Sequence, residues 1–330
     1  MSKSFLLGSL GWVLAVCCLI GGGWTQSLQA KGWDREPVQP LPVCTRLFQD
    51  KVRLGRQLFH EVRLSFNNSQ SCADCHPLHR WGADGQRHSR KADGSQTVMN
   101  TPTVYNVRYY IAQFWNGRVR TLQDQVEEAV RLEMGSQWPE VVSKLAQDAS
   151  YRQSFAQIYS DGLQAANVRD ALAEFMRSLL LVNSRFDRYL RGESNAITPL
   201  EQEGYRLFKE VGCVACHQGV NLGGNLLQKS GIFLRRAVEE PVNTSVQERV
   251  EADRFQLTGN EEDREVFKVP ALRLVTRTAP YFHDGSLPTV EEAVGRMAQL
   301  QLGRSLNQAD IAKIVAFFHT LEGSLAGECR

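Results

Sequence analysis

The chain opens on an uninterrupted apolar stretch, from Phe5 to Ile20, that follows a single early lysine. A run of three glycines then interrupts the stretch, and small residues lead to Ala30. A charged start, an apolar run and a small-residue end are typical of a secretory signal peptide, which we place at residues 1–30. The apolar run is also near the lower limit for spanning a bilayer, so an uncleaved membrane anchor is the alternative.

Behind this segment, apolar residues recur mainly at the three-to-four-residue spacing of amphipathic helices. Few segments alternate between apolar and polar residues as strands do. The stretch Trp81–Gln96 is rich in Gly, Asp and Ser and predicts a long loop. The expected fold class is therefore mainly α with long loops. The pattern predicts helices over 122–132, 138–148, 151–159, 168–190 and 309–321.

Two similar segments indicate an internal duplication of the chain. Leu54-Gly-Arg-Gln-Leu-Phe59 and Glu203-Gly-Tyr-Arg-Leu-Phe208 carry apolar residues at the same helical positions. Thr198-Pro199 is a typical helix start and marks a boundary between the two copies. Because the length of 330 residues exceeds one comfortable hydrophobic core, we expect an N-terminal domain at 31–195 and a C-terminal domain at 196–330.

Each of these segments leads into a Cys-x-x-Cys-His motif, Cys72-Ala-Asp-Cys75-His76 in the first copy and Cys213-Val-Ala-Cys216-His217 in the second. Two thiols at this spacing can add to the two vinyl groups of one porphyrin, and the adjacent histidine then binds the iron. A zinc site would need further protein ligands, which neither motif has nearby. We therefore expect two covalently bound c-type haems, in two cytochrome c-like domains.

Charge and cysteine usage limit the possible cellular compartments and binding partners of the protein. Cytochrome c assembly takes place outside the cytoplasm, so the motifs agree with the export signal and predict a periplasmic protein. The formal net charge is +2 and no basic run occurs, which argues against a nucleic-acid partner. Outside the signal and the two motifs, only Cys44 and Cys329 are left. An oxidising compartment allows them to form a disulfide, and two separate thiols are the alternative.

Five further motifs follow in order along the chain: Asn100-Thr-Pro-Thr-Val-Tyr-Asn106, Gln113-Phe-Trp-Asn-Gly-Arg118, Glu133-Met-Gly135, Gly219-Val-Asn-Leu-Gly-Gly224 and Ala279-Pro-Tyr-Phe-His-Asp-Gly285. From about Lys51 to Gly323, the chain resembles the bacterial di-haem cytochrome c peroxidases, a group that includes the enzyme that matures tryptophan tryptophylquinone. The resemblance implies reduction of H2O2 to water with electrons from a small periplasmic cytochrome c or cupredoxin. It also implies a homodimer, although the sequence shows no interface.

The resemblance gives the two haems different tasks. The haem of the first motif would be the peroxidatic one, and the haem of the second would accept electrons from the donor protein. The electron-accepting haem would have His217 and Met297 as axial ligands, because a thioether favours ferrous iron and raises the reduction potential. The alternative for Met297 is a core residue on a helix. Relatives that mature the quinone cofactor have a tyrosine at this position.

The resemblance also implies roles for residues around the peroxidatic iron. Glu133 would move the proton of bound peroxide with Gln125 beside it, although the segment between them is shorter than in the family. Trp115 would relay electrons between the haems, and core packing is its alternative. The usual distal histidine is replaced by Ala92, so we expect an open, high-spin ferric iron. His88 in the same loop is the competing ligand, and an exposed loop histidine is its other interpretation.

Three more residues match the family's interdomain calcium ligands. Asn100 would supply a side-chain amide oxygen, and Thr278 and Pro280 would supply backbone carbonyls, which are donors that suit Ca²⁺. Two other functions stay open beside peroxide reduction. One is oxidation of residues in a partner protein, which Met297 disfavours. The other is a plain di-haem electron carrier or redox sensor, which Glu133 and the missing distal histidine disfavour.

Overall fold

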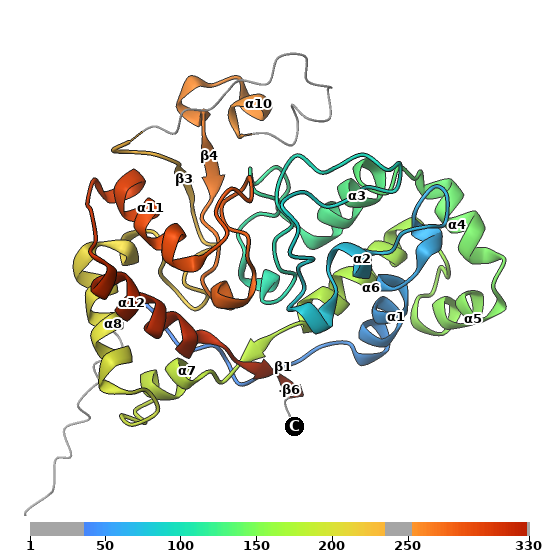
Figure 1. The fold of residues 1–330 in the computed structure, drawn as a ribbon. Helices are drawn as coiled ribbons and strands as arrows, with labels where there is room; N and C mark the ends of the chain where they lie inside the picture. Colours follow the sequence, from blue (N-terminus) through green and yellow to red (C-terminus); the bar gives the residue numbers. More distant parts are fainter. Residues whose placement is uncertain (1–35, 235–252, 329–330) are drawn as a thin grey trace, which may run out of the picture. The chain divides into compact units, whose positions relative to one another are not determined.

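The computed structural model describes residues 36–234 and 253–328, and residues 36–330 cluster as one compact unit. The predicted signal peptide at 1–30 lies outside the described residues. The fold is mainly helical, as expected (Figure 1). The division into two haem domains stays a prediction. The helices are α1 (Gln49–Phe59), α2 (Cys72–Cys75), α3 (Leu122–Leu132), α4 (Trp138–Ala146), α5 (Ala149–Ile158), α6 (Ala165–Ser178), α7 (Arg185–Leu190), α8 (Pro199–Val211), α10 (Phe255–Thr258), α11 (Val290–Leu302) and α12 (Gln308–Phe318).

Strands are short and occur in pairs in the part of the chain that the structure describes. β1 pairs with β6 in parallel, whereas β2 pairs with β5 and β3 with β4 in antiparallel fashion. Long loops connect many of the helices (Figure 1). The strands are β1 (Cys44–Thr45), β2 (Leu181–Val182), β3 (Leu227–Lys229), β4 (Val266–Lys268), β5 (Ser324–Leu325) and β6 (Gly327–Glu328).

Most predicted helices are present, but the long helix expected over 168–190 is wrong. α6 ends at Ser178, and the chain passes through β2 before α7 begins. Asn183 has a left-handed φ of 56°, which a continuing helix excludes. Ser184 then caps α7, because its Oγ accepts the backbone N–H of Asp187 and the Asp187 carboxylate accepts the N–H of Ser184. A break and a new capping box therefore replace the continuous helix.

The helices that lead into the two Cys-x-x-Cys-His motifs pack in the same way. α1 lies along α6, and α8 lies along α12 (Figure 1). A Cβ atom added to Gly55 would lie 2.0 Å from the carbonyl oxygen of Ala171, and one added to Gly204 would lie 2.0 Å from that of Lys313. Glycine allows the two backbones to approach this closely at both crossings. The packing agrees with an internal duplication.

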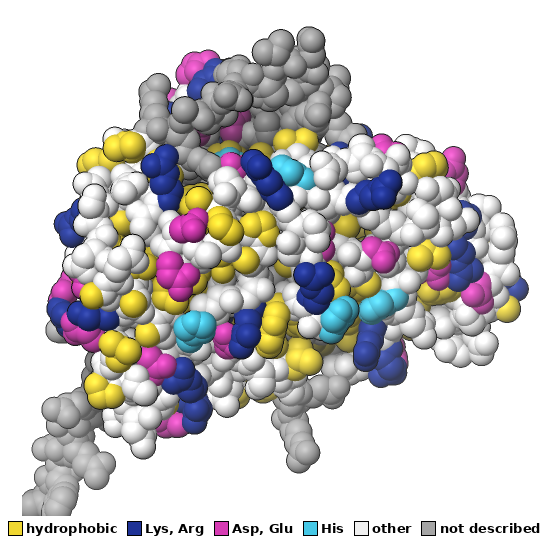
Figure 2. Space-filling model, viewed as in Figure 1, with side chains coloured by type: hydrophobic (Ala, Val, Ile, Leu, Met, Phe, Trp, Pro, Cys, Tyr) yellow, Lys and Arg dark blue, Asp and Glu magenta, His cyan; other side chains and the backbone are white. Residues whose placement is uncertain are grey.

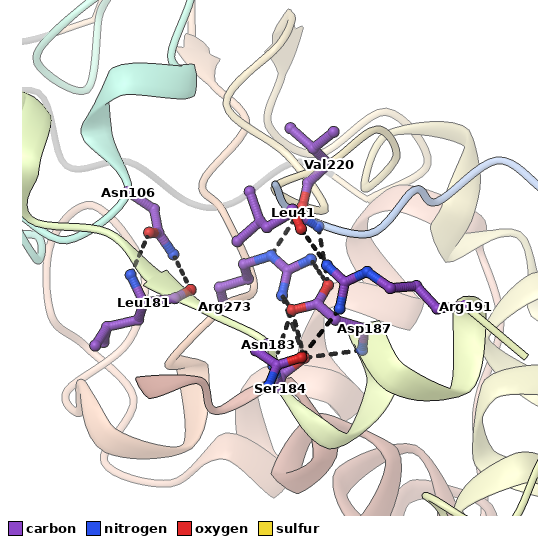
Figure 3. A network of polar contacts seen from close by, with 9 residues as sticks. All are labelled: Leu41, Asn106, Leu181, Asn183, Ser184, Asp187, Arg191, Val220 and Arg273. Carbon is purple, nitrogen blue, oxygen red and sulfur yellow. Dashed lines mark hydrogen bonds and ion pairs between the residues drawn. The ribbon is translucent and has the colours of Figure 1, made fainter. Parts of the chain in front are cut away.

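A buried ion pair joins segments that are far apart in the sequence (Figure 3). Arg273 donates to the carboxylate of Asp187 at 2.8 Å, and the two side chains are 1% and 0% exposed. The Asp187 carboxylate also accepts the N–H of Leu41 at 3.0 Å, and Arg273 Nε donates to the carbonyl of Val220 at 2.8 Å. These extra hydrogen bonds compensate for removing both charges from water. The pair therefore ties the N-terminal segment, α7 and two loops of the C-terminal half together.

Cys44 lies at the pairing of the two chain ends. β1 places it opposite Gly327, and its sulfur is in a disulfide. The expected partner, Cys329, lies outside the described residues, so the pairing of these two cysteines stays a prediction. The four cysteines of the two motifs are free thiols.

The surface shown in Figure 2 carries scattered charges. Lys and Arg side chains are spread among acidic and apolar ones on this face and do not gather into one patch. Among the described residues, no helix combines the length and the apolar character that crossing a membrane requires.

Candidate haem sites

The first Cys-x-x-Cys-His motif lies beside a cleft of about 960 Å³ and a smaller cavity, and Cys75 and His76 line both. We call the cleft and this cavity together the N-terminal cleft. Cys72 and Cys75 begin and end the single turn of α2. The Nδ1 atom of His76 lies 3.0 Å from the carbonyl oxygen of Gly82. Burial lowers the pKa of His76, so its ring is neutral and Nδ1–H donates to this carbonyl. Nε2 therefore carries the lone pair that a metal needs.

The second motif repeats this arrangement in a cleft of about 1170 Å³, which we call the C-terminal cleft. His217 Nδ1 lies 3.2 Å from the carbonyl oxygen of Leu222. Burial lowers the pKa of His217 to about 4, which again leaves a neutral ring with a free Nε2. Phe208, Phe267 and Phe318 are among the residues that line the cleft. An apolar wall beside a histidine nitrogen suits a porphyrin.

The thiols of both motifs suit covalent attachment better than metal coordination. Burial raises the pKa of Cys72 and of Cys75 to about 12, and that of Cys213 to about 11, so all three are neutral thiols. A zinc site would need several deprotonated ligands around one point. Within the described ranges, no three His, Cys, Asp or Glu side chains gather in a way that could hold a metal ion. The donor set of each cleft therefore fits a c-type haem.

The residues expected around the peroxidatic iron line the N-terminal cleft. Gln125 lies on α3, Glu133 caps the C-terminus of this helix, and Trp115 comes from the preceding loop. The N–H of Ala92 donates to the carbonyl of Glu133 at 3.2 Å, which holds the 81–96 loop against the end of α3. His88, the competing ligand, is not among the residues that line this cleft.

The residues expected around the second haem line the C-terminal cleft. Met297, on α11, shares this cleft with His217. The ring of His283 stacks on that of Phe267, with 4.1 Å between the ring centroids, and belongs to the same wall. His283 therefore lies in the wall around the second motif.

The two clefts meet at a pair of reciprocal backbone contacts. The N–H of Lys268 donates to the carbonyl of Trp115 at 2.6 Å, and the N–H of Asn100 donates to the carbonyl of His283 at 2.7 Å. In this pair of contacts, each half of the chain donates one hydrogen bond to the other. The indole Nε1–H of Trp115 also donates to the carbonyl of Asn100 at 2.8 Å, and Trp115 lines both clefts. Trp115 is therefore held rigidly at the boundary between the two clefts.

The expected calcium ligands lie around this same contact. Asn100 binds the backbone of His283, which belongs to the loop that also contains Thr278 and Pro280. The Asn100 amide donates through Nδ2 to the carbonyl of Gln86 at 2.8 Å, so the amide oxygen Oδ1 points to the other side of the group. Hard oxygen donors of this kind are the ones that Ca²⁺ prefers.

Comparisons with known proteins agree with this geometry. A family model described as di-haem cytochrome c peroxidase matches residues 49–195. The cytochrome c551 peroxidase of Nitrosomonas europaea is 39% identical over 291 residues, which cover 87% of this chain and 84% of that relative. The chain belongs to the di-haem cytochrome c peroxidase family. Family membership implies two haems, in agreement with the two clefts.

Two further likenesses support the family. The cytochrome c peroxidase Ccp of Escherichia coli is 40% identical over 291 residues, which are 87% of this chain but only 61% of that relative. This chain therefore spans less than two thirds of the E. coli protein. The crystal structure of a MauG-like protein associated with microbial copper homeostasis matches with a TM-score of 0.68 and 27% identity, over 91% of this chain and 95% of that one.

Within this family fold, a repeated turn aligns the two clefts residue by residue. Gln113 and Tyr281 start the turn, because the N–H of each donates at 2.7 Å to a carbonyl six residues later. Phe114 and Phe282 follow with left-handed φ values of 64° and 70°. Thr121 and Thr289 then cap α3 and α11 in the same way. This shared register pairs Gln125 with Ala293, Ala129 with Met297, and Glu133 with Gln301, and all six residues line their clefts.

Sequence reasoning missed three residues of the clefts. Ala129 takes the place of Met297 in the N-terminal cleft, a correspondence that aligning the two turn motifs would have revealed. Arg118 lines the N-terminal cleft with its guanidinium 3.3 Å from the ring centroid of Phe114. Lys268 lines both clefts and is only 5% exposed. No sequence signal marks a single lysine as buried.

Proposed function

We propose that this chain is a periplasmic peroxidase that reduces H2O2 to two water molecules, consuming two electrons and two protons. One observation carries the proposal. The wall that holds Cys75 and His76 also holds Gln125 and Glu133, and it has no thioether at the position of Ala129. A haem held by Cys72, Cys75 and His76 would supply the redox chemistry beside the carboxylate of Glu133, and the small side chain of Ala129 would leave room for peroxide. The names of the relatives at 34–40% identity support the same activity.

Two c-type haems fit the clefts, one on Cys72, Cys75 and His76 and the other on Cys213, Cys216 and His217. When bound, they supply the one-electron redox capacity that the side chains of this chain lack. His76 and His217 each present Nε2 while the backbone holds Nδ1–H, which fixes the tautomer and the ring orientation.

Glu133 acts as the acid–base group of the N-terminal cleft. Its carboxylate takes a proton from one oxygen of peroxide and returns it to the other oxygen as the O–O bond breaks. Gln125 lies two helical turns earlier on α3 and lines the same cleft, so its amide can hydrogen-bond the peroxide. The backbone contact from Ala92 holds the end of the helix that carries Glu133.

The C-terminal cleft receives the electrons. Met297 would hold the haem of this cleft together with His217, and its neutral, soft sulfur would favour the ferrous state that an electron-accepting haem must reach. The donor is a small periplasmic cytochrome c or a cupredoxin that delivers one electron at a time. Trp115 relays each electron, because it lines both clefts and is fixed through its indole N–H.

A structural calcium ion is part of the proposal. Asn100 Oδ1 and the carbonyls of Thr278 and Pro280 would hold it, with water completing its shell. The ion would stabilise the contact at which Asn100 binds the backbone of His283. Removing calcium with a chelator is expected to slow turnover and shift the haem spectra, and adding Ca²⁺ back is expected to restore both. Unchanged spectra and turnover would remove calcium from the proposal.

Two measurements test the proposed function. The as-isolated ferric protein is expected to show a high-spin signal beside a low-spin His/Met signal by electron paramagnetic resonance, and H2O2 is expected to consume the high-spin signal. Turnover of H2O2 with reduced cytochrome c is expected in the same preparation. Two low-spin signals that peroxide leaves unchanged, without turnover, would indicate an electron carrier.

Oxidation of residues in a partner protein is the second candidate. It would show the high-spin signal and consume peroxide, but it would not oxidise reduced cytochrome c. Met297 lines the C-terminal cleft where relatives of that type have a tyrosine, which favours peroxidase over this candidate.

A further inference from the structure

Lys268 is a buried cation at the boundary of the two clefts. It is the last residue of β4, is 5% exposed, and lines both clefts. Among the residues that the structure describes, no carboxylate forms an ion pair with its ammonium group. Burial lowers the pKa of Lys268 to about 7. A buried ammonium is costly unless an anion accompanies it, so a negatively charged partner at this position would keep Lys268 charged.

The ammonium group of Lys268 lies on the side of the N-terminal cleft. Its Nζ is 3.8 Å from the ring centroid of Tyr110, and Tyr110 lines the N-terminal cleft but not the C-terminal one. The backbone of Lys268 is held from the same side, because its N–H donates to the carbonyl of Trp115. A residue of the C-terminal half thus directs its charge into the cleft of the other half.

The chemistry of a c-type haem supplies the missing anion at this place. The two propionates of a haem extend from the edge opposite the vinyl groups, and the vinyl groups are bonded to the two cysteines. The cavity beside Cys72 does not include Lys268 or Tyr110, whereas the wider part of the cleft does. The carboxylates of a haem attached at Cys72 and Cys75 would therefore be directed toward the wall on which Lys268 lies.

We propose that the Lys268 ammonium pairs with a propionate of the N-terminal haem, so that a residue from the C-terminal half sets the charge at the peroxidatic site. The pair makes Lys268 a positioning residue that stabilises ferrous over ferric iron in the N-terminal cleft. This inference rests on the haem proposed at Cys72 and Cys75, and it does not depend on peroxide reduction.

The first test measures both haem midpoint potentials in Lys268→Gln holoprotein by spectroscopic redox titration. At the wild-type midpoint, we expect the ferric-to-ferrous ratio of the N-terminal haem to rise about tenfold, which is about 59 mV for a one-electron couple. The C-terminal haem is expected to change less. Lys268→Arg keeps the charge, so its N-terminal potential should stay close to that of the wild type.

Lys229→Gln is the matched control. Lys229 lies on β3, which pairs with β4, but it lines neither cleft, so its removal should leave the N-terminal potential unchanged. An unshifted N-terminal potential in Lys268→Gln would overturn the proposal, as would a shift confined to the C-terminal haem. Haems are counted beforehand by the pyridine haemochromogen method. This count separates a failure of the Lys268–propionate pair from a failure of the proposed cofactors, because fewer than two haems would refute the cofactors.

A measurement on the wild-type protein covers the case in which Lys268→Gln does not fold. Resonance Raman spectra of the haem contain propionate bending modes, and an ammonium hydrogen bond makes such a mode sensitive to exchange into D2O. We expect one propionate mode of the N-terminal haem to shift in D2O. Propionate modes that are all insensitive to D2O would contradict the ion pair.

Discussion

The two clefts share part of their scaffold but differ at three equivalent positions that line them. In both halves, the helix that leads into the attachment motif crosses a later helix at a glycine, and a left-handed phenylalanine and a threonine cap precede the helix that lines the cleft. The N-terminal cleft has an amide, a methyl group and a carboxylate where the C-terminal cleft has a methyl group, a thioether and an amide. The corresponding residues are Gln125, Ala129 and Glu133 on one side, and Ala293, Met297 and Gln301 on the other.

This difference shows how one duplicated unit can perform two tasks. In the proposed function, a thioether at Met297 would fill a coordination position and favour electron acceptance, whereas the methyl group of Ala129 would leave that position open. A carboxylate at Glu133 can move a proton, whereas the amide of Gln301 cannot. In this proposal, three pairs of equivalent side chains would separate substrate chemistry from electron entry.

The strongest test of this comparison is to close the open site. Ala129→Met should place a thioether at the position equivalent to that of Met297. We expect the high-spin signal of the N-terminal haem to be replaced by a low-spin one, because the sixth position is filled. Turnover with H2O2 and reduced cytochrome c should fall by about 10³-fold or more, equivalent to about 4 kcal/mol of activation free energy.

Ala129→Leu is the control, because it adds similar bulk without a ligand atom. It should keep a high-spin signal even if added volume in the cleft slows turnover. If Ala129→Met stays high-spin with both haems bound, the register of the two helices does not extend to the iron, and the comparison fails at its central position.

The next test exchanges the carboxylate for the amide that the other cleft has. Glu133→Gln should lower peroxide turnover by about 10²-fold, because the variant keeps the shape of the cleft but loses the proton acceptor. Steady-state kinetics with both haems counted is the measurement. Glu127→Gln is the control on the same helix, since Glu127 pairs with Arg169 at 2.7 Å and does not line the cleft. If Glu133→Gln turns over peroxide at the wild-type rate, another group transfers the proton.

Local sequence signals predicted some of these features and missed others. α3 begins and ends where its apolar period indicated, because the Thr121 cap agrees with the amphipathic pattern there. The helix expected over 168–190 was wrong, since no glycine or proline marks the left-handed Asn183, and the apolar residues around it suit a helix as well as a strand. The secondary-structure prediction failed where tertiary packing and a new helix cap determined the backbone conformation.

At the site too, the sequence predicted some residues and missed others. The Cys-x-x-Cys-His spacing, which has a chemical reason, predicted His76, whereas Glu133 and Met297 were expected from the resemblance to the family; all three line the clefts. Ala129 was missed because a lone alanine on a helix has no chemistry of its own, and its meaning comes only from alignment with the other copy. Lys268 was missed because its burial depends on contacts between the halves, which no local pattern encodes.

A third test asks whether the close helix crossing at a glycine is equally important for stability in the two copies. Gly55→Ala and Gly204→Ala should each lower the free energy of unfolding by about 1–3 kcal/mol, because either Cβ would collide with a facing carbonyl. Chemical denaturation of the holoprotein is the measurement. Gly295→Ala, in α11, should stabilise the protein by about 0.5–1 kcal/mol, since its Cβ meets only Ile311 Cδ1 at 3.4 Å. A loss in only one of the two glycine variants would show that the copies pack differently.

The smallest expected effect concerns Trp115, where the two clefts meet. Trp115→Phe keeps an aromatic ring but removes the indole N–H that donates to the carbonyl of Asn100. Losing this bond should cost about 1 kcal/mol of folding free energy, because a partly buried carbonyl loses its donor. Electron transfer from the C-terminal to the N-terminal haem should slow by about tenfold, or about 1.4 kcal/mol of activation free energy. Photoreduction of the C-terminal haem, followed by the arrival of the electron at the other haem, measures this rate.

Trp138→Phe distinguishes the relay from the packing role of a tryptophan. Trp138 begins α4, is half-buried and lines neither cleft, so its replacement should affect folding alone. If Trp115→Phe lowers stability but leaves the transfer rate unchanged, Trp115 is a core residue and the haems exchange electrons by another route. A slowed transfer without any change in the two midpoint potentials would instead locate the effect in the pathway, because the driving force would be the same in both proteins.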